Sequence, residues 1–117
     1  MSDDHPIRIE PRRGRVIVRL GAHTVADTTR ALSLHEASYP PVTYIPRVDV
    51  DMSLLAASDH ATICPFKGDA SYFHIDVGAR RVDNAVWSYE TPHAAVAQIR
   101  SYLAFYPTSV EFIDRED

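Results

Sequence analysis

Alternating apolar and polar positions run along most of the chain and predict a series of short β-strands. Residues 15–20 and 23–27 are rich in β-branched side chains and flank Gly21-Ala22, which predicts a hairpin. Residues 31–36 place leucine at every second position, as in a half-buried strand. Further strands are expected at 42–45, 59–63, 70–77, 82–89 and 110–113, with 70–77 and 82–89 forming a second hairpin.

One segment has the spacing of an α-helix instead. Thr91 is a suitable N-cap, Pro92 suits the first helical position, and Val96, Ile99 and Leu103 recur at i, i+3 and i+7. Pro107 would end this helix. The pattern therefore predicts a mainly β single domain at 14–113 with one C-terminal α-helix, preceded by a mobile lead-in at 1–13 and followed by a frayed tail at 114–117.

Composition narrows the class of protein. A chain of 117 residues with 45% hydrophobic and 24% charged residues is typical of one globular domain. The net charge of −4 argues against a broad basic surface for phosphates, so no nucleic-acid partner is expected.

The cysteine and histidine content limits the compartment and the cofactors. Cys64 is the only cysteine, which excludes an intramolecular disulfide and a zinc site built on paired thiolates. The six histidines are scattered singly, so we expect no metal and no other cofactor. The acidic N-terminus is unlike a secretory signal, and no apolar run approaches the roughly 20 residues that cross a bilayer. We therefore expect a cytoplasmic protein without a membrane partner.

Several short motifs follow one another between Arg15 and Phe112. The most specific are Cys64-Pro65-Phe66-Lys67-Gly68 and Trp87-Ser88-Tyr89; the others are Val25-Ala26-Asp27, Arg30-Ala31-Leu32, His35-Glu36, the segment from Tyr39 to Val50, Asp59-His60, Ala70-Ser71-Tyr72, Asn84-Ala85-Val86 and the segment from Tyr102 to Tyr106. In this order they resemble a bacterial family catalogued as domain of unknown function 427.

The resemblance implies an Mss4-like, β-tent-type fold, in which two antiparallel sheets meet at an angle. Methionine sulfoxide reductase B and the thalidomide-binding domain of cereblon have related architectures. Many of these relatives hold zinc with paired cysteines, which this chain lacks, so zinc is not carried over. The family is sometimes labelled nucleotidyltransferase-like, but the chain has no phosphate-cradling Gly-rich loop, and the resemblance implies no activity.

Cys64, Lys67 and Gly68 form the first candidate site, in a predicted turn. A nearby ammonium favours the nucleophilic thiolate, and glycine lets backbone approach a ligand closely. The alternative is that Cys64 is a small buried hydrophobe and Lys67 a solvated turn residue.

Aromatic residues on predicted strands form the second candidate site. Trp87 and Tyr89 share one face of their strand because side chains alternate, and Tyr72 and Tyr44 lie on other strands. These four side chains either make a cage around a small ligand or pack as ordinary core. We expect Tyr44 and Tyr89 to face a pocket, since their hydroxyls need a partner or water.

Glu36 and Arg47 bracket a proline-containing break and allow two interpretations. They form a structural ion pair, or Arg47 and Lys67 receive an anionic group while Glu36 acts as general base. Asp49 and Asp51 share a face, but two acids alone indicate solvated surface rather than a cation site.

The favoured function is a binding domain for a small molecule, with an anionic ligand as one option. Two alternatives stay open: a small enzyme that uses Glu36, Lys67 or Cys64 as catalytic residue, and a homodimeric protein-protein interaction domain. The ligand-binding residues expected are Tyr44, Arg47, Lys67, Gly68, Tyr72, Trp87 and Tyr89.

Overall fold

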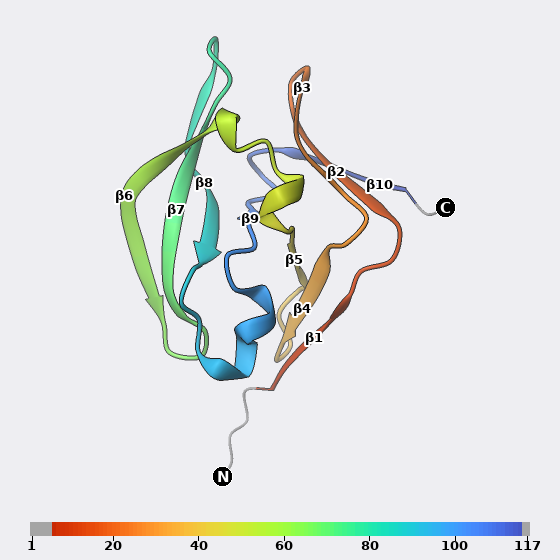
Figure 1. Ribbon diagram of the computed structural model, residues 1–117, viewed down its shortest axis with the longest axis vertical. Helices are drawn as coiled ribbons and strands as arrows, with labels where there is room; N and C mark the ends of the chain where they lie inside the picture. Colours follow the sequence, from red (N-terminus) through yellow and green to blue (C-terminus); the bar gives the residue numbers. More distant parts are fainter. Residues whose placement is uncertain (1–5, 116–117) are drawn as a thin grey trace.

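Ten β-strands and three short 3-10 helices make up the computed structural model over residues 6–115, which are the residues it describes (Figure 1). In chain order the elements are β1 (Ile7–Pro11), β2 (Arg15–Leu20), β3 (His23–Thr28), β4 (Leu32–Glu36), β5 (Val42–Tyr44), η1 (Arg47–Asp49), η2 (Met52–Leu54), β6 (Leu55–Cys64), β7 (Gly68–Asp76), β8 (Arg81–Tyr89), η3 (Ala94–Ile99), β9 (Ala104–Phe105) and β10 (Glu111–Arg115).

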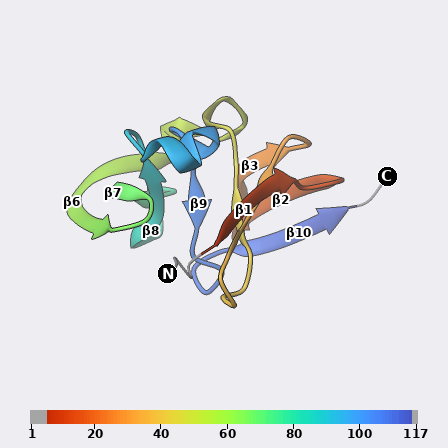
Figure 2. The ribbon, with the colours of Figure 1, turned by 90° about the horizontal axis from the view of Figure 1, so that it is seen from below.

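The strands form three antiparallel sheets among the described residues. Their orders are β1-β4-β5, β10-β2-β3 and β6-β7-β8-β9. Figures 1 and 2 show the four-stranded sheet on one side of the molecule and both three-stranded sheets on the other. The mainly β class is confirmed, whereas the expectation of two sheets is wrong.

The third sheet arises because one long hairpin breaks in the middle. Strand β1 leads into β2, and their partners β4 and β3 are likewise consecutive in the chain. Between the two pairs, Gly14 has a positive φ of 82°, a conformation that glycine adopts without strain. The N–H of Arg12 still donates to the carbonyl of Ala31 at 2.8 Å, so the break is a bend with few ladder bonds.

Both predicted hairpins form. Strands β2 and β3 meet at Gly21, and β7 pairs with β8. Strand β1, however, lies within the segment expected to be a mobile lead-in. It is ordered as a strand because Ile7 and Ile9 pack against apolar residues of the interior. Strand β10 likewise includes Asp114 and Arg115 of the expected tail. The parts of these two segments at 1–5 and 116–117 lie outside the described residues.

The predicted C-terminal α-helix is wrong. Its place is taken by η3, which is six residues long and kinked at Val96. The apolar stripe is buried as expected, with Val96, Ile99 and Leu103 fully inside. The backbone bonds with strands instead: Ser101 donates to Tyr89, and Leu103 exchanges two bonds of 2.8 Å with Ile45. These tertiary bonds override the local helix spacing.

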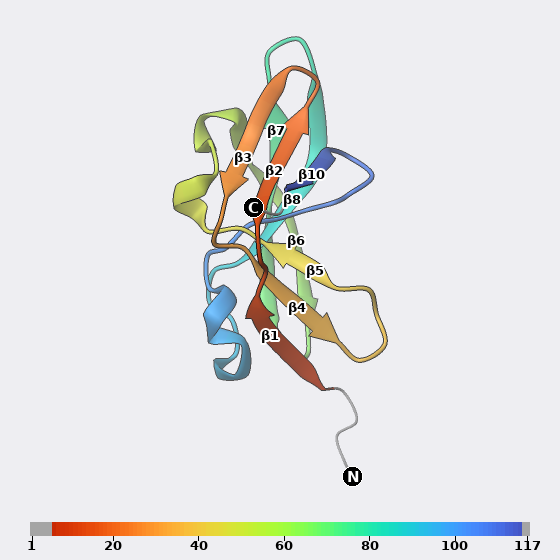
Figure 3. The same ribbon diagram turned by 90° about the vertical axis from the view of Figure 1, so that its right-hand side faces the viewer.

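Two hydrophobic cores use opposite faces of β7. Phe73 and Ile75 contribute to the first core, against β2 and β3, whereas Ala70 and Tyr72 contribute to the second, against β4 and β5. Because side chains alternate along a strand, these two pairs point in opposite directions. Figure 3 shows the three 3-10 helices and the β4–β5 connection on opposite sides of the molecule.

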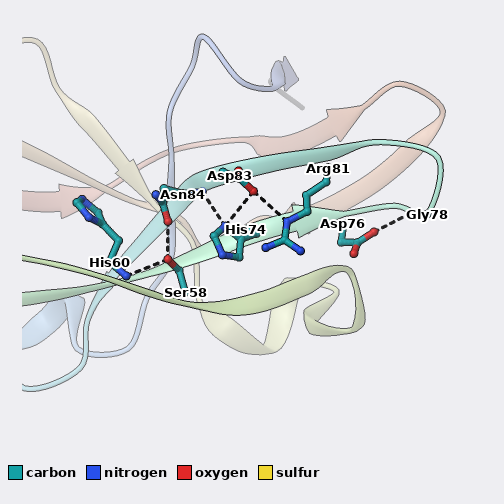
Figure 4. A network of polar contacts seen from close by, with 8 residues as sticks. All are labelled: Ser58, His60, His74, Asp76, Gly78, Arg81, Asp83 and Asn84. Atoms are coloured by element: carbon teal, nitrogen blue, oxygen red, sulfur yellow. Dashed lines mark hydrogen bonds and ion pairs between the residues drawn. The ribbon is translucent and has the colours of Figure 1, made fainter.

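A polar network links β6, β7 and β8 at the point where their pairing is irregular (Figure 4). The pairing register shifts near Ser58 in β6 and near Asn84 in β8, where Asn84 has a φ of 52°. Ser58 donates to the amide oxygen of Asn84, and the Asn84 N–H donates to Nδ1 of His74 at 3.1 Å. His74 Nδ1 also lies 3.4 Å from Asp83 Oδ1, and Arg81 Nε donates to the same oxygen at 2.9 Å. Such bulges increase the bend and twist of a strand.

Candidate functional site

A buried ion pair joins two of the sheets. Lys67 lies in the turn between β6 and β7, and Glu36 is the last residue of β4. Lys67 Nζ lies 2.5 Å from Glu36 Oε1, and the two side chains are only 10% and 17% exposed. A pair this far from water needs good geometry, because both charges lose much of their hydration.

The backbone around Gly68 holds Lys67 in position. The Lys67 N–H donates to the carbonyl of Cys64 at 3.3 Å, and the Lys67 carbonyl accepts the His93 N–H at 2.9 Å. Gly68 has a φ of 118°, and a Cβ there would lie 3.4 Å from Pro92 Cα. The close approach predicted for Gly68 is therefore made by the chain's own 91–93 segment, and Gly68 is outside the cavity lining.

The ion pair lines a cavity of about 220 Å³ with aromatic walls. Its lining is Leu34, Glu36, Val42, Tyr44, Lys67, Tyr72, Trp87, Tyr89 and Tyr106. All four aromatic candidates thus come together with Glu36 and Lys67.

Tyr106 is the lining residue that sequence reasoning missed. Its ring lies 4.6 Å from that of Trp87, centroid to centroid. Strand β9 places it there, since Ala104 pairs with Trp87 and Tyr106 donates its N–H to Ala85. The available signal was its place in the motif from Tyr102 to Tyr106, which the helix prediction obscured.

The aromatic walls contact one another through edges and hydrogen bonds. The rings of Tyr44 and Trp87 meet edge to face at 6.4 Å, and Trp87 Nε1 donates to the Tyr44 hydroxyl at 3.3 Å. The Tyr72 hydroxyl lies 3.1 Å from Thr62 Oγ1. Lys67 Nζ lies 6.0 Å from the ring centroid of Tyr89, within reach of a cation–π contact.

Burial raises the pKa of three tyrosines of the cavity. It raises the pKa of Tyr44 to about 12, and it also raises the pKa of Tyr89 well above its ordinary value. The pKa of Tyr106 rises to about 12, mainly through burial and then through its contact with Tyr72. Among residues 6–115, the Tyr89 hydroxyl has no hydrogen-bond partner, although Tyr89 is only 6% exposed.

A larger apolar cavity of about 520 Å³ adjoins this site. The two cavities share Glu36, Val42 and Trp87 as lining residues. The rest of the larger lining is mostly apolar: Tyr39, Pro40, Pro41, Thr43, Phe105, Pro107 and Phe112, with Arg12. A polar site therefore opens beside an apolar one, with Trp87 between them.

Arg47 does not line this cavity. It contacts the opposite face of the β6-β7-β8-β9 sheet, where Ser88 points away from its cavity-lining neighbours Trp87 and Tyr89. Its guanidinium donates to the carbonyl of Ser101, the hydroxyl of Ser88 and the carboxylate of Glu90, at 3.0, 3.2 and 3.0 Å. It also lies 5.6 Å from the ring centroid of Phe73. Neither the expected Glu36–Arg47 pair nor an anion site shared by Arg47 and Lys67 forms.

Cys64 shares the turn of Lys67 but points into apolar surroundings. It is half-buried and packs against the second core, outside the lining of the 220 Å³ cavity. A nucleophilic role for Cys64 stays a prediction.

The two aspartates considered for a cation have other partners. Asp49 accepts hydrogen bonds from Thr28 and Arg30, and the Thr28 bond is the main cause that lowers the pKa of Asp49. Asp51 accepts from the N–H and the hydroxyl of Ser53. Within residues 6–115, no three His, Cys, Asp or Glu side chains gather as a metal site would require.

No helix within residues 6–115 has the length and apolar character needed to span a bilayer.

Comparison with known sequences gives a family and no activity. No curated protein matches the chain. The sequence profile of the family described as domain of unknown function (DUF427) matches residues 8–116, a range that includes every residue of the aromatic cavity. The match covers nearly the whole chain, and the protein belongs to the family of domain of unknown function 427.

Proposed function

We propose that the protein binds a small amphipathic molecule, with its polar end beside Lys67 and Glu36 and its apolar body in the adjoining cavity. The observation that carries this proposal is that a largely buried ion pair lines a cavity instead of being sealed in the core. Together with the adjoining cavity, whose walls are mostly apolar, it has the character of a small-molecule site.

The polar groups define the end of the ligand. Glu36 already balances the charge of Lys67, so the site favours a group that both accepts and donates hydrogen bonds over a bare anion. An ammonium has three N–H donors, and Lys67 uses one of them on Glu36. The unpartnered Tyr89 hydroxyl offers a further donor or acceptor.

The adjoining cavity defines the body of the ligand. Its prolines and phenylalanines offer flat apolar surface, and Trp87 lines both cavities. A molecule that occupied both would bury its apolar part against these residues and hold its polar part at the ion pair.

Trp87 provides a direct measurement because it is the only tryptophan of the sequence. We would titrate the protein with benzamide, benzoate, benzylamine and toluene and follow Trp87 fluorescence. Benzamide is expected to give the largest saturable change, since its amide both donates and accepts. Tyr89→Phe should weaken benzamide binding about fivefold to tenfold, the effect of one lost hydrogen bond.

The matched control is Tyr102→Phe, which removes a tyrosine hydroxyl outside the lining of both cavities. It should leave benzamide affinity unchanged. The proposal fails if no fragment saturates, or if Tyr102→Phe weakens binding as much as Tyr89→Phe. A homodimer stays a separate prediction, which light scattering during gel filtration would test.

A further inference from the structure

Lys67 is the only lysine among the 12 lysines and arginines of the sequence. Every other such side chain is arginine, including Arg47 in its hydrogen-bonded position on the other face of the sheet. The one lysine is thus a largely buried residue that lines a cavity.

The two cationic side chains differ chemically in a way that matters here. A guanidinium stays protonated in proteins and binds a carboxylate with two parallel bonds, so arginine is the better residue for an ion pair alone. An amine can lose its proton when it is desolvated, and it then becomes a nucleophile. A cavity that holds lysine where the chain otherwise uses arginine is suited to amine chemistry.

Glu36 is placed to take the proton that makes the amine reactive. Its Oε1 accepts the hydrogen bond of Lys67 Nζ, so the carboxylate and the amine are in direct contact, as a general base and its proton donor must be. Both groups are largely buried, with side chains 10% and 17% exposed, and Tyr44 and Tyr89 line the same cavity.

We propose that Lys67 forms a reversible imine with an aldehyde or ketone bound in this cavity. The inference rests on the proposed function, since the carbonyl compound must first bind. It adds a covalent step and names the chemical class of the ligand.

The step balances within the site. The Lys67 ammonium gives a proton to the Glu36 carboxylate, and the Nζ electron pair attacks the carbonyl carbon. An N–H proton moves to the former carbonyl oxygen to give a carbinolamine. Glu36 then returns its proton to this hydroxyl, which leaves as water while the C=N bond forms. The products are a protonated imine on Lys67, an ionised Glu36 and one water molecule.

Tyr89 has a defined place in this step. Its hydroxyl lines the cavity without a partner among residues 6–115 and can donate to the carbonyl oxygen, which makes the carbon more electrophilic. It is a neutral donor because burial raises its pKa.

Reductive trapping tests the inference on the full chain. We would incubate the protein at pH 7 with benzaldehyde and sodium cyanoborohydride, which reduces an imine to a stable benzylamine. Intact mass would count the benzyl groups, and peptide mapping would locate them. The α-amino group is the only other primary amine, and an acetylated lysine amide in the same solution gives the reference rate for an unassisted side chain.

We expect Lys67 to be trapped at least tenfold faster than this reference. Glu36→Gln should slow trapping about 100-fold, as expected when a general base is lost. Tyr89→Phe, which leaves the ion pair in place, should slow it by a smaller factor and serves if Glu36→Gln does not fold. Lys67→Arg should leave the α-amino group as the single labelled position.

Trp87 fluorescence with benzaldehyde separates the two proposals. If benzaldehyde saturates the fluorescence change while Lys67 is trapped no faster than the reference, the imine is wrong and binding stands. If Lys67 reacts only in urea and benzaldehyde leaves Trp87 fluorescence unchanged, both proposals are wrong.

Discussion

Arg47 and Lys67 occupy opposite faces of one sheet, and each lies beside a carboxylate and an aromatic ring. Arg47 has Glu90 and Phe73, and Lys67 has Glu36 and Tyr89. By composition the two sites are nearly the same, and from the sequence both residues were expected to anchor one ligand.

The difference lies in how completely each cation is hydrogen-bonded. Arg47 bonds to a backbone carbonyl, a buried serine and a carboxylate, which together hold η1, β8 and the segment after η3. The Lys67 ammonium has one hydrogen-bond partner among the described residues, Glu36, and it lines a cavity. Arg47 uses its N–H donors to hold parts of the fold together. The Lys67 ammonium, beside a cavity, has N–H donors that remain available to a ligand.

The largest effect on stability is expected at Lys67. Lys67→Met removes the cationic partner of the largely buried Glu36 carboxylate, which should cost about 3 kcal/mol in the free energy of unfolding, measured with urea. The double variant Lys67→Met/Glu36→Leu should recover most of this loss, because no buried charge remains. A double variant as unstable as the single one would show that packing, and not charge, is responsible.

A somewhat smaller loss is expected at Arg47. Arg47→Lys cannot reproduce the three bonds to Ser101, Ser88 and Glu90, so the free energy of unfolding should fall by about 2 kcal/mol. Fragment affinity, read from Trp87, should not change, because Arg47 is on the other face. If Arg47→Lys lowered fragment affinity as well as stability, Arg47 and Lys67 would belong to one binding site after all.

Alkaline pH should affect the cavity face selectively. The folded pKa of Tyr44 is about 12, above its ordinary value of 10, so the folded state holds this proton more tightly. The stabilisation is complete below pH 10 and is lost as the pH rises from 10 to about 12, with a slope of at most about 1.4 kcal/mol per pH unit for each such group. Tyr44→Phe should flatten this slope in urea unfolding between pH 9 and 11.5. An unchanged slope would mean that the pKa of Tyr44 is not raised in the folded state.

The smallest effect is expected at Glu90. Its side chain is 44% exposed, so its ion pair with Arg47 is screened by water. Glu90→Gln should change the free energy of unfolding by less than about 0.5 kcal/mol, since Arg47 keeps its bonds to Ser101 and Ser88. If Glu90→Gln destabilised the protein as much as Arg47→Lys, the ion pair with Glu90 would be the main stabilising interaction of Arg47.

Local patterns predicted the parts of the fold that local forces determine. Alternation located both hairpins, since each strand pairs with its neighbour in the chain. The α-helix failed because Leu103 bonds with Ile45, 58 positions away in the chain, and no helical period reveals that partner.

The site was predictable as a set of residues and not as an arrangement. Tyr44, Tyr72, Trp87 and Tyr89 were identified by type and strand position, and all four line the cavity. The Glu36–Lys67 pair is separated by 31 positions and comes from two sheets, so no spacing rule links the two residues. Arg47 was placed wrongly because its face depends on where η1 packs, which the sequence pattern does not record.

The assembly of the cavity from separate sheets also affects how the molecule opens. Glu36, Val42 and Tyr44 come from one sheet, while Trp87 and Tyr89 come from another, so the cavity exists only while the two are docked. Anything that occupies it is released when the sheets part, and its binding free energy adds to the free energy of their docking. An occupant would therefore slow amide hydrogen exchange in β4 and β8 together, although these strands do not share a single ladder bond.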